Sequence, residues 1–201
     1  MALVSLGMTL RQVWAAIIAF IGCAPAFTAT NVNGVPNLDQ YAPDMWRMGQ
    51  PADATAWSYV DSVIGKPGKP VLVVKLNDDG EGDDSPMLGF QDWHLDKEAM
   101  PPEDNKPWTI FVKPDPKQVS LVVNTVIAAH QAGWVVVHHC TAGRDRTSLI
   151  AALVQQKMFG WTKQQVLDDM LKHGYRWELP DLDAYLIENV RAKPLPISKL
   201  N

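Results

Sequence analysis

A strand, a short polar loop and a helix in immediate succession constrain this chain most. Residues 134–138 are rich in valine and predict a buried strand, and residues 148–154 predict a helix. A loop between a strand and a helix N-terminus turns free backbone N–H groups inward, where they can bind an anion. The segment therefore predicts an anion-binding loop with the sequence His139-Cys140-Thr141-Ala142-Gly143-Arg144-Asp145-Arg146-Thr147.

A cysteine and an arginine stand at the two ends of this loop. A helix dipole and a nearby positive charge are the settings in which cysteine acts as a reactive thiolate. Cys140 is therefore the candidate nucleophile, and the guanidinium of Arg146 can hold two phosphate oxygens in a fixed fork. The pattern predicts attack by cysteine on the phosphorus of a phosphate ester. The alternative is a buried structural cysteine that happens to precede a helix.

Further loop residues are expected to surround the bound phosphate. We assign substrate binding to Thr141, Ala142, Gly143, Arg144 and Thr147. Gly143 suits a left-handed turn or a close backbone approach. The Thr147 hydroxyl can donate a hydrogen bond to the cysteine sulfur or, equally, bond the backbone of the first helical turn.

The loop at 139–147 resembles the phosphate-binding loop of the cysteine-dependent protein tyrosine and dual-specificity phosphatases. Residues 46–51 resemble a "YRSGQP" segment of bacterial secreted or periplasmic members, and residues 73–77 resemble the strand that follows it. Residues 160–175 resemble a segment of one bacterial branch. The resemblance spans roughly residues 41 to 190. It implies a phosphatase of the tyrosine or dual-specificity type that works through a phosphocysteine intermediate.

The order of the predicted elements indicates an α/β protein. Strands and helices alternate, which predicts a central, mainly parallel sheet flanked by helices, as the tyrosine phosphatase-like fold of the dual-specificity type also implies. The loop would lie at the carboxyl end of a central strand, where such sheets bind ligands. Residues 31–45 are predicted to be irregular. Besides 134–138, strands are predicted at 70–76 and 90–95, and helices at 52–64, 116–130, 146–159, 162–172 and 180–191.

The first thirty residues differ from the rest of the chain. Arg11 is the only charged residue before Asp39, and it precedes an apolar run and an Ala-Pro-Ala sequence at 24–26. This pattern predicts a signal peptide over residues 1–26, a single phosphatase domain over 31–201, and a periplasmic or secreted bacterial protein. An uncleaved membrane anchor and a lipoprotein-type site remain alternatives. Removing this segment leaves Cys140 as the only cysteine, so its thiol is either reactive or paired between chains.

Proton donation to the leaving oxygen requires a carboxylic acid near the loop. In the family that the chain resembles, this acid lies on a loop after the strand that precedes the last long helix. Asp96 has that position, and Glu98, Glu103 and Asp104 follow it in the same loop. If residues 108–112 form the relevant strand, the acid is instead Asp115, which also fits a helix cap.

Asp145 is the second candidate acid. Bacterial members whose loop reads "HCxAGKDRT" carry an aspartate at the corresponding place, where the resemblance implies a possible acid. The alternative is a first-turn carboxylate that pairs with the helix dipole or with Arg144. We favour Asp145 over Asp96 by a small margin, because its position does not depend on a strand assignment.

The amino-acid composition limits the kinds of substrate and partner that we expect for this chain. The net charge of −4 argues against nucleic acid, whose binders are usually basic. We expect a phosphorylated protein or a small phosphate ester as substrate, membrane contact only if the N-terminal segment is uncleaved, and neither cofactor nor metal, since the chemistry uses protein groups alone. The alternatives are an inositol phosphate or lipid head-group phosphatase, which the acidic region 77–104 disfavours, and a phosphate-binding pseudophosphatase. A redox or sulfurtransferase role leaves the spacing of Gly143 and Arg146 unexplained.

Overall fold

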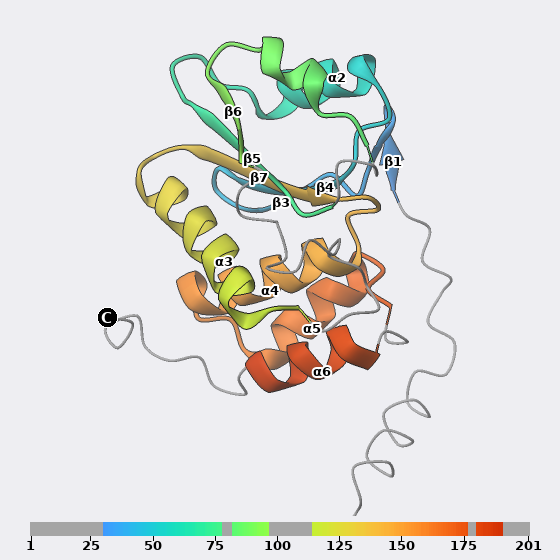
Figure 1. Ribbon diagram of the computed structural model, residues 1–201, viewed down its shortest axis with the longest axis vertical. Helices are drawn as coiled ribbons and strands as arrows, with labels where there is room; N and C mark the ends of the chain where they lie inside the picture. The colour runs from blue at the N-terminus through green and yellow to red at the C-terminus, as the bar shows by residue number, and fades with distance from the viewer. Residues whose placement is uncertain (1–29, 78–81, 97–113, 177–179, 191–201) are drawn as a thin grey trace, which may run out of the picture.

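A five-stranded sheet lies at the centre of the computed structural model, which describes residues 30–77, 82–96, 114–176 and 180–190 (Figure 1). The strand order is β3-β4-β7-β5-β6. Within this sheet of described strands, β3 and β4 pair antiparallel, and the β4–β7, β7–β5 and β5–β6 pairs are parallel. The predicted α/β fold with a mainly parallel sheet is therefore confirmed. The strands are β3 (Asp39–Ala42), β4 (Met45–Gly49), β5 (Val71–Lys75), β6 (Trp93–Asp96) and β7 (Val135–Cys140).

The prediction that residues 31–45 are irregular is wrong. A small hairpin of β1 (Asn31–Val32) and β2 (Val35–Pro36) is followed by β3 and the start of β4. The turns depend on left-handed residues, with φ angles of 51° at Asn33 and 58° at Asp44. Asn33-Gly34 is a strong hairpin signal that the sequence reading missed, because the flanking strands are only two residues long.

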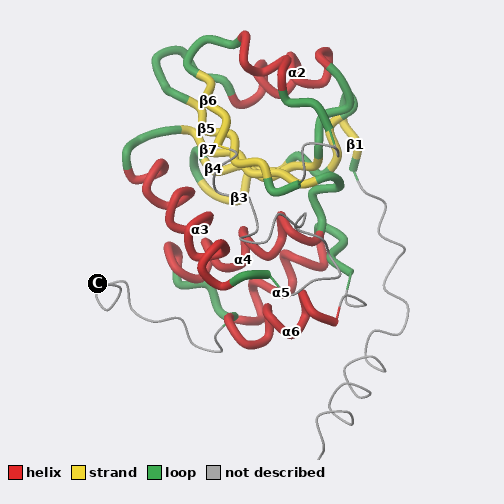
Figure 2. Tube along the Cα trace, in the orientation of Figure 1, coloured by secondary structure: helices red, strands yellow, loops and turns green. Residues whose placement is uncertain are grey.

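Helices cover both faces of the sheet. The helix α2 (Ala54–Ile64) and the short 3-10 helix η2 (Ser85–Gly89) lie on one face (Figure 1). In the described part of the chain, four helices lie on the other face, and Figure 2 shows the strands as a band between the two helical layers. These four are α3 (Pro116–Gln131), α4 (Asp145–Phe159), α5 (Lys163–Lys172) and α6 (Pro180–Asn189).

Side-chain capping bonds mark the starts of three helices, α2, α3 and α5. The Asp53 carboxylate accepts from the Ala56 N–H, and the Asp115 carboxylate accepts from the Lys117 N–H. Thr162 forms a reciprocal capping box with Gln165. These side chains bond the N–H groups that have no partner in the first helical turn, and so fix where each helix begins.

The central strand β7 sends its side chains alternately to the two faces. Val136 and Cys140 belong to the core shared with α3–α6, and Val135 and Val137 to the core under α2. All six residues of the strand are buried. Because β4 and β5 flank it on both sides, its carboxyl end lies at the middle of the sheet edge.

None of the helices within the described ranges is long and apolar enough to cross a membrane. The predicted signal peptide at 1–26 lies outside the described residues.

Candidate active site

The predicted anion-binding loop joins the carboxyl end of β7 to the N-terminus of α4. Cys140 is the last residue of the strand and is 3% exposed. Gly143 has a φ of 67°, the left-handed conformation that the sequence predicted for it. Thr141 and Ala142 are exposed, so the loop faces solvent at its tip. A helix N-terminus behind a solvent-facing loop is a site for an anion.

Cys140 and Arg146 are held by bonds across the loop. The Thr147 hydroxyl donates to the Cys140 sulfur over 3.1 Å, which selects one of the two roles left open for it. Nη1 of Arg146 donates to the Leu76 carbonyl (3.1 Å) and Nη2 to the Thr141 hydroxyl (3.1 Å). The guanidinium plane is therefore fixed from β5 on one side and from the loop on the other.

Asp145 is buried and bonded to a distant arginine. Its Oδ1 accepts from the Arg176 N–H (3.1 Å), and its Oδ2 accepts from Nε (3.0 Å) and Nη2 (2.5 Å) of the same residue. Arg144 donates from Nε to the Gly174 carbonyl (2.6 Å). Two adjacent loop residues thus anchor the segment after α5, and both Asp145 oxygens are engaged in that anchoring.

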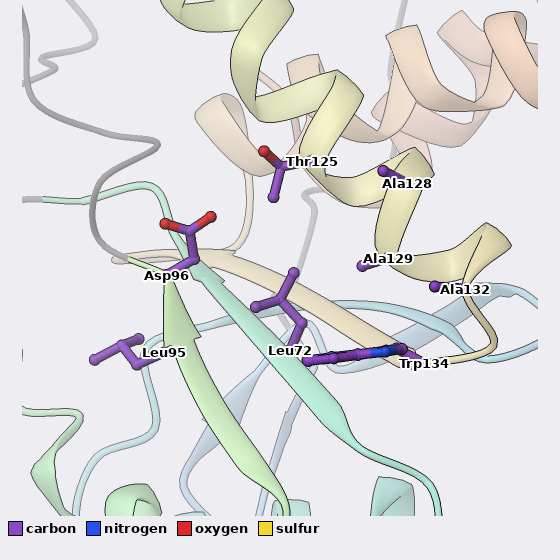
Figure 3. Close-up of a pocket in the computed structure, with 8 residues that line it drawn as sticks. All are labelled: Leu72, Leu95, Asp96, Thr125, Ala128, Ala129, Ala132 and Trp134. Atoms are coloured by element: carbon purple, nitrogen blue, oxygen red, sulfur yellow. The ribbon is translucent and has the colours of Figure 1, made fainter.

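Asp96 ends β6 at the edge of the sheet. Asp96 pairs with Val74 on β5, and Val74 pairs with His138 on β7. Asp96 is therefore two strand spacings from β7, at the level of the residue that comes two positions before Cys140. Strand spacings place the two Cα atoms about 12 Å apart, which leaves room for a substrate group between the side chains. In Figure 3 the Asp96 carboxylate points toward Thr125 of α3, at one end of a groove between α3 and the sheet.

The other candidate acids divide into two groups. Glu98, Glu103 and Asp104 lie outside the described residues. Asp115 caps α3 through the Lys117 N–H, which confirms the capping role considered for it.

A buried polar cluster backs the loop on the α2 face. Lys75 pairs with Asp84 over 2.7 Å, and Nε2 of Gln50 donates to the same carboxylate over 2.7 Å. His139 Nε2 is 3.6 Å from Asp84, and its ring packs edge-on against Trp57. Burial lowers the pKa of His139 to about 4, so the ring is neutral at physiological pH.

Arg47 is a site residue to which the sequence reading gave no role. It is fully buried in β4, pairs with Asp169 over 3.2 Å and donates to the Gly143 carbonyl (3.1 Å) and the Ser148 hydroxyl (2.5 Å). Burial lowers the pKa of Arg47, and the negative charge of Asp169 opposes that shift. The signal that could have identified Arg47 from the sequence is its position as a charged residue within an apolar segment.

Comparisons with known proteins agree with the predicted resemblance. The model of the tyrosine phosphatase family matches residues 94–189. The chain is 35% identical over 74 residues to the dual specificity protein phosphatase TpbA of Pseudomonas aeruginosa (strain UCBPP-PA14). That match covers 36% of this chain and 34% of the relative, about a third of its length.

Solved structures show the same fold. The crystal structure of P. aeruginosa TpbA superimposes with a TM-score of 0.57 at 24% identity, over 82% of this chain and 91% of that one. A cysteine-to-serine form of TpbA in complex with pTyr superimposes with a TM-score of 0.54 at 23% identity. The match covers 79% of this chain and 87% of that one. A putative phosphatase from Shewanella putrefaciens CN-32 superimposes with a TM-score of 0.53 at 21% identity. The match covers 77% of this chain and 89% of that one. The resemblance to tyrosine and dual-specificity phosphatases is confirmed.

Proposed function

We propose that this chain, a relative of the tyrosine and dual-specificity phosphatases, hydrolyses phosphomonoesters through a phosphocysteine intermediate. The observation that carries the proposal is the loop itself. The Cys140 sulfur accepts a hydrogen bond from Thr147, and the Arg146 guanidinium is fixed across the same loop. A nucleophile and a bidentate phosphate binder thus face one helix N-terminus.

The reaction has two steps. The Cys140 thiolate attacks phosphorus in line, the S–P bond forms, and the ester P–O bond breaks as the leaving oxygen takes a proton from a carboxylic acid. Water then attacks the phosphocysteine, the S–P bond breaks, and the thiolate returns as inorganic phosphate leaves. The loop amides and Arg146 hold the equatorial oxygens in both steps. The Thr147 hydroxyl makes the sulfur a better leaving group in the second.

The proton in the first step is assigned to Asp96. A general acid must present its proton to the leaving oxygen. The Asp145 oxygens accept three hydrogen bonds from Arg176, which supports an anchoring role for Asp145 instead. Asp96 ends β6 on the α3 face, the face that Cys140 also occupies.

Phosphorylated protein is the substrate class that we propose. The structure of TpbA with pTyr supports phosphotyrosine, and the acidic sequence at 77–104 disfavours small polyanions such as inositol phosphates. The apolar segment at 1–26 supports export, and N-terminal sequencing of the cellular protein tests it: a mature chain that begins near Phe27 supports export, and an intact N-terminus on cytoplasmic protein excludes it.

The test of activity compares wild type with Cys140→Ser on p-nitrophenyl phosphate, a phosphopeptide panel and an inositol phosphate panel. We expect wild-type turnover on the phosphopeptides, and a loss of at least about a thousandfold in Cys140→Ser. Inorganic phosphate should still bind the variant, because the amides and Arg146 remain. Turnover by Cys140→Ser within tenfold of wild type contradicts the proposal, and a preference for the inositol phosphates contradicts the substrate class.

A further inference from the structure

The carbonyl groups of the phosphate loop are bonded by residues far away in the sequence. The backbone N–H of Gln50 donates to the Thr141 carbonyl over 3.0 Å. The side-chain amide of Asn37 donates to the Ala142 carbonyl over 2.9 Å, across 105 residues of sequence. Asn37 is 2% exposed, so this donor is committed inside the protein.

Arg47 bonds the next carbonyl and also bonds the start of α4. One nitrogen, Nη2, donates both to the Gly143 carbonyl and to the Ser148 hydroxyl. The other, Nη1, pairs with Asp169 of α5, and Gln155 donates to the same carboxylate oxygen over 3.1 Å. The guanidinium is thereby fixed from the side opposite the loop.

The loop backbone also packs directly on the end of β4. A Cβ on Gly143 would come within 2.5 Å of the Gly49 nitrogen, and a Cβ on Gly49 within 2.8 Å of the Ala142 carbonyl carbon. Real Cβ atoms do not approach so closely, so both positions require glycine. The two backbones are in contact without an intervening side chain.

This bonding has a geometric consequence for the loop. The C=O and N–H of one trans peptide unit point in opposite directions. Holding the carbonyls of Thr141, Ala142 and Gly143 toward the β4 side therefore turns the next three N–H groups the other way. Those are the amides that bind phosphate oxygens in the proposed reaction.

We infer that Asn37, Arg47 and Gln50, called the brace below, form a positioning element that sets the oxyanion-binding geometry of the phosphate loop. The inference rests on the proposed function. All three brace residues precede residues 94–189, the segment that matches the tyrosine phosphatase family. The catalytic loop therefore depends on an N-terminal segment that carries none of the reacting groups.

The sharpest test is Asn37→Asp with Asn33→Asp as its matched control. Both asparagines have left-handed backbones, with φ angles of 50° and 51°, and both lie in the same N-terminal segment. Asn33 is exposed, whereas Asn37 bonds the loop. The substitution keeps the side-chain shape but places a carboxylate oxygen against the Ala142 carbonyl where a donor had been.

Three quantities are measured for each variant: kcat and KM on p-nitrophenyl phosphate, and the Kd for inorganic phosphate. We expect Asn37→Asp to lower kcat/KM by about tenfold or more, mainly through kcat, and to weaken phosphate binding to a similar degree. Asn33→Asp should stay within about twofold of wild type. Equal behaviour of the two variants overturns the inference.

Additional variants separate positioning from folding. Asn37→Gly accommodates the left-handed backbone and removes the side chain with its donor, so it serves if Asn37→Asp does not fold, and wild-type phosphate affinity in it overturns the inference. Val126→Ala in the α3 core is the control for stability. This variant should have a lower Tm and an unchanged Kd for phosphate. If Val126→Ala weakens phosphate binding as much as the brace variants do, the effect of the brace is only structural.

The inference and the proposed function fail in different ways. If wild type neither turns over p-nitrophenyl phosphate nor binds phosphate, the proposed function fails. If wild type does both and the brace variants match their controls, the inference alone fails.

Discussion

The phosphate loop and the β6 edge differ in how the rest of the chain holds them. The loop follows the central strand β7, and both neighbouring strands contribute to it, with Arg47 from β4 and the Leu76 carbonyl after β5 bonding its residues. Among the described residues, the strand β6 pairs with one strand, β5, and its end faces the groove beside α3 (Figure 3).

This difference separates the two halves of the proposed reaction. The groups that attack and hold the phosphate are fixed by buried contacts, so their geometry exists before substrate binds. The proposed proton donor, Asp96, lies at the sheet edge about 12 Å from the nucleophile by strand spacing, and contributes only when a substrate bridges that gap. Substitutions in the loop should therefore affect every substrate, and substitutions at the edge only some.

The largest expected effect is that of Arg146→Lys. A lysine carries the charge but not the planar fork, and it cannot bond the Leu76 carbonyl, the Thr141 hydroxyl and two phosphate oxygens together. We expect kcat to fall by about a thousandfold on p-nitrophenyl phosphate and on phosphopeptides alike. Kinetics within tenfold of wild type would exclude Arg146 as the group that binds the transition state.

The next largest effects on turnover are expected from substitutions of the two candidate acids, Asp96 and Asp145. A general acid matters only when the leaving group is poor, so Asp96→Asn should slow phenyl phosphate by about a hundredfold and p-nitrophenyl phosphate far less. Asp145→Asn should give a smaller loss that is equal for both, because its carboxylate anchors Arg176. The reverse pattern would restore Asp145 as the acid. Equal effects in both variants would move the search to Glu98, Glu103 and Asp104.

The smallest expected effect is on stability. Because burial lowers the pKa of His139 to about 4 from 6.5, the unfolded chain binds more protons than the folded one between these values. The free energy of unfolding therefore falls as the pH falls through this window, by about 3 kcal/mol for this residue. Burial also lowers the pKa of His138, which acts in the same direction.

Urea unfolding at pH 7 and pH 4.5 measures this loss. His139→Asn on β7 should lose less stability between the two pH values than wild type. His94→Asn is the matched control on the β6 edge, where the side chain is exposed, and should keep the wild-type loss. A wild-type pH dependence in His139→Asn would show that the ring is not excluded from water.

The sequence predicted the parts of the molecule that local chemistry determines. Valine-rich strands and several helices were predicted because their signals lie within a few residues, as at Asp115 with Pro116. The loop could be predicted because its cysteine, glycine and arginine lie close together in the sequence.

The remainder depends on contacts between distant residues. The partner of Asp145 is 31 residues away at Arg176, and Asn37 bonds the loop from 105 residues away. Neither pairing leaves a local pattern in the sequence, so neither could be predicted, and residues 31–45 were expected to be irregular. The signal peptide at 1–26 and the domain limits at 31–201 stay predictions.

Rapid acid quench during turnover, followed by mass spectrometry of the peptide that contains Cys140, tests the central claim most directly. The account predicts that a phosphoryl group appears on the Cys140 sulfur within the first turnover and decays as inorganic phosphate is released. It also predicts that Thr147→Val lengthens that decay, because the sulfur then lacks the hydrogen bond from Thr147. Turnover with no phosphoryl group on Cys140, or with the group on another residue, contradicts the account.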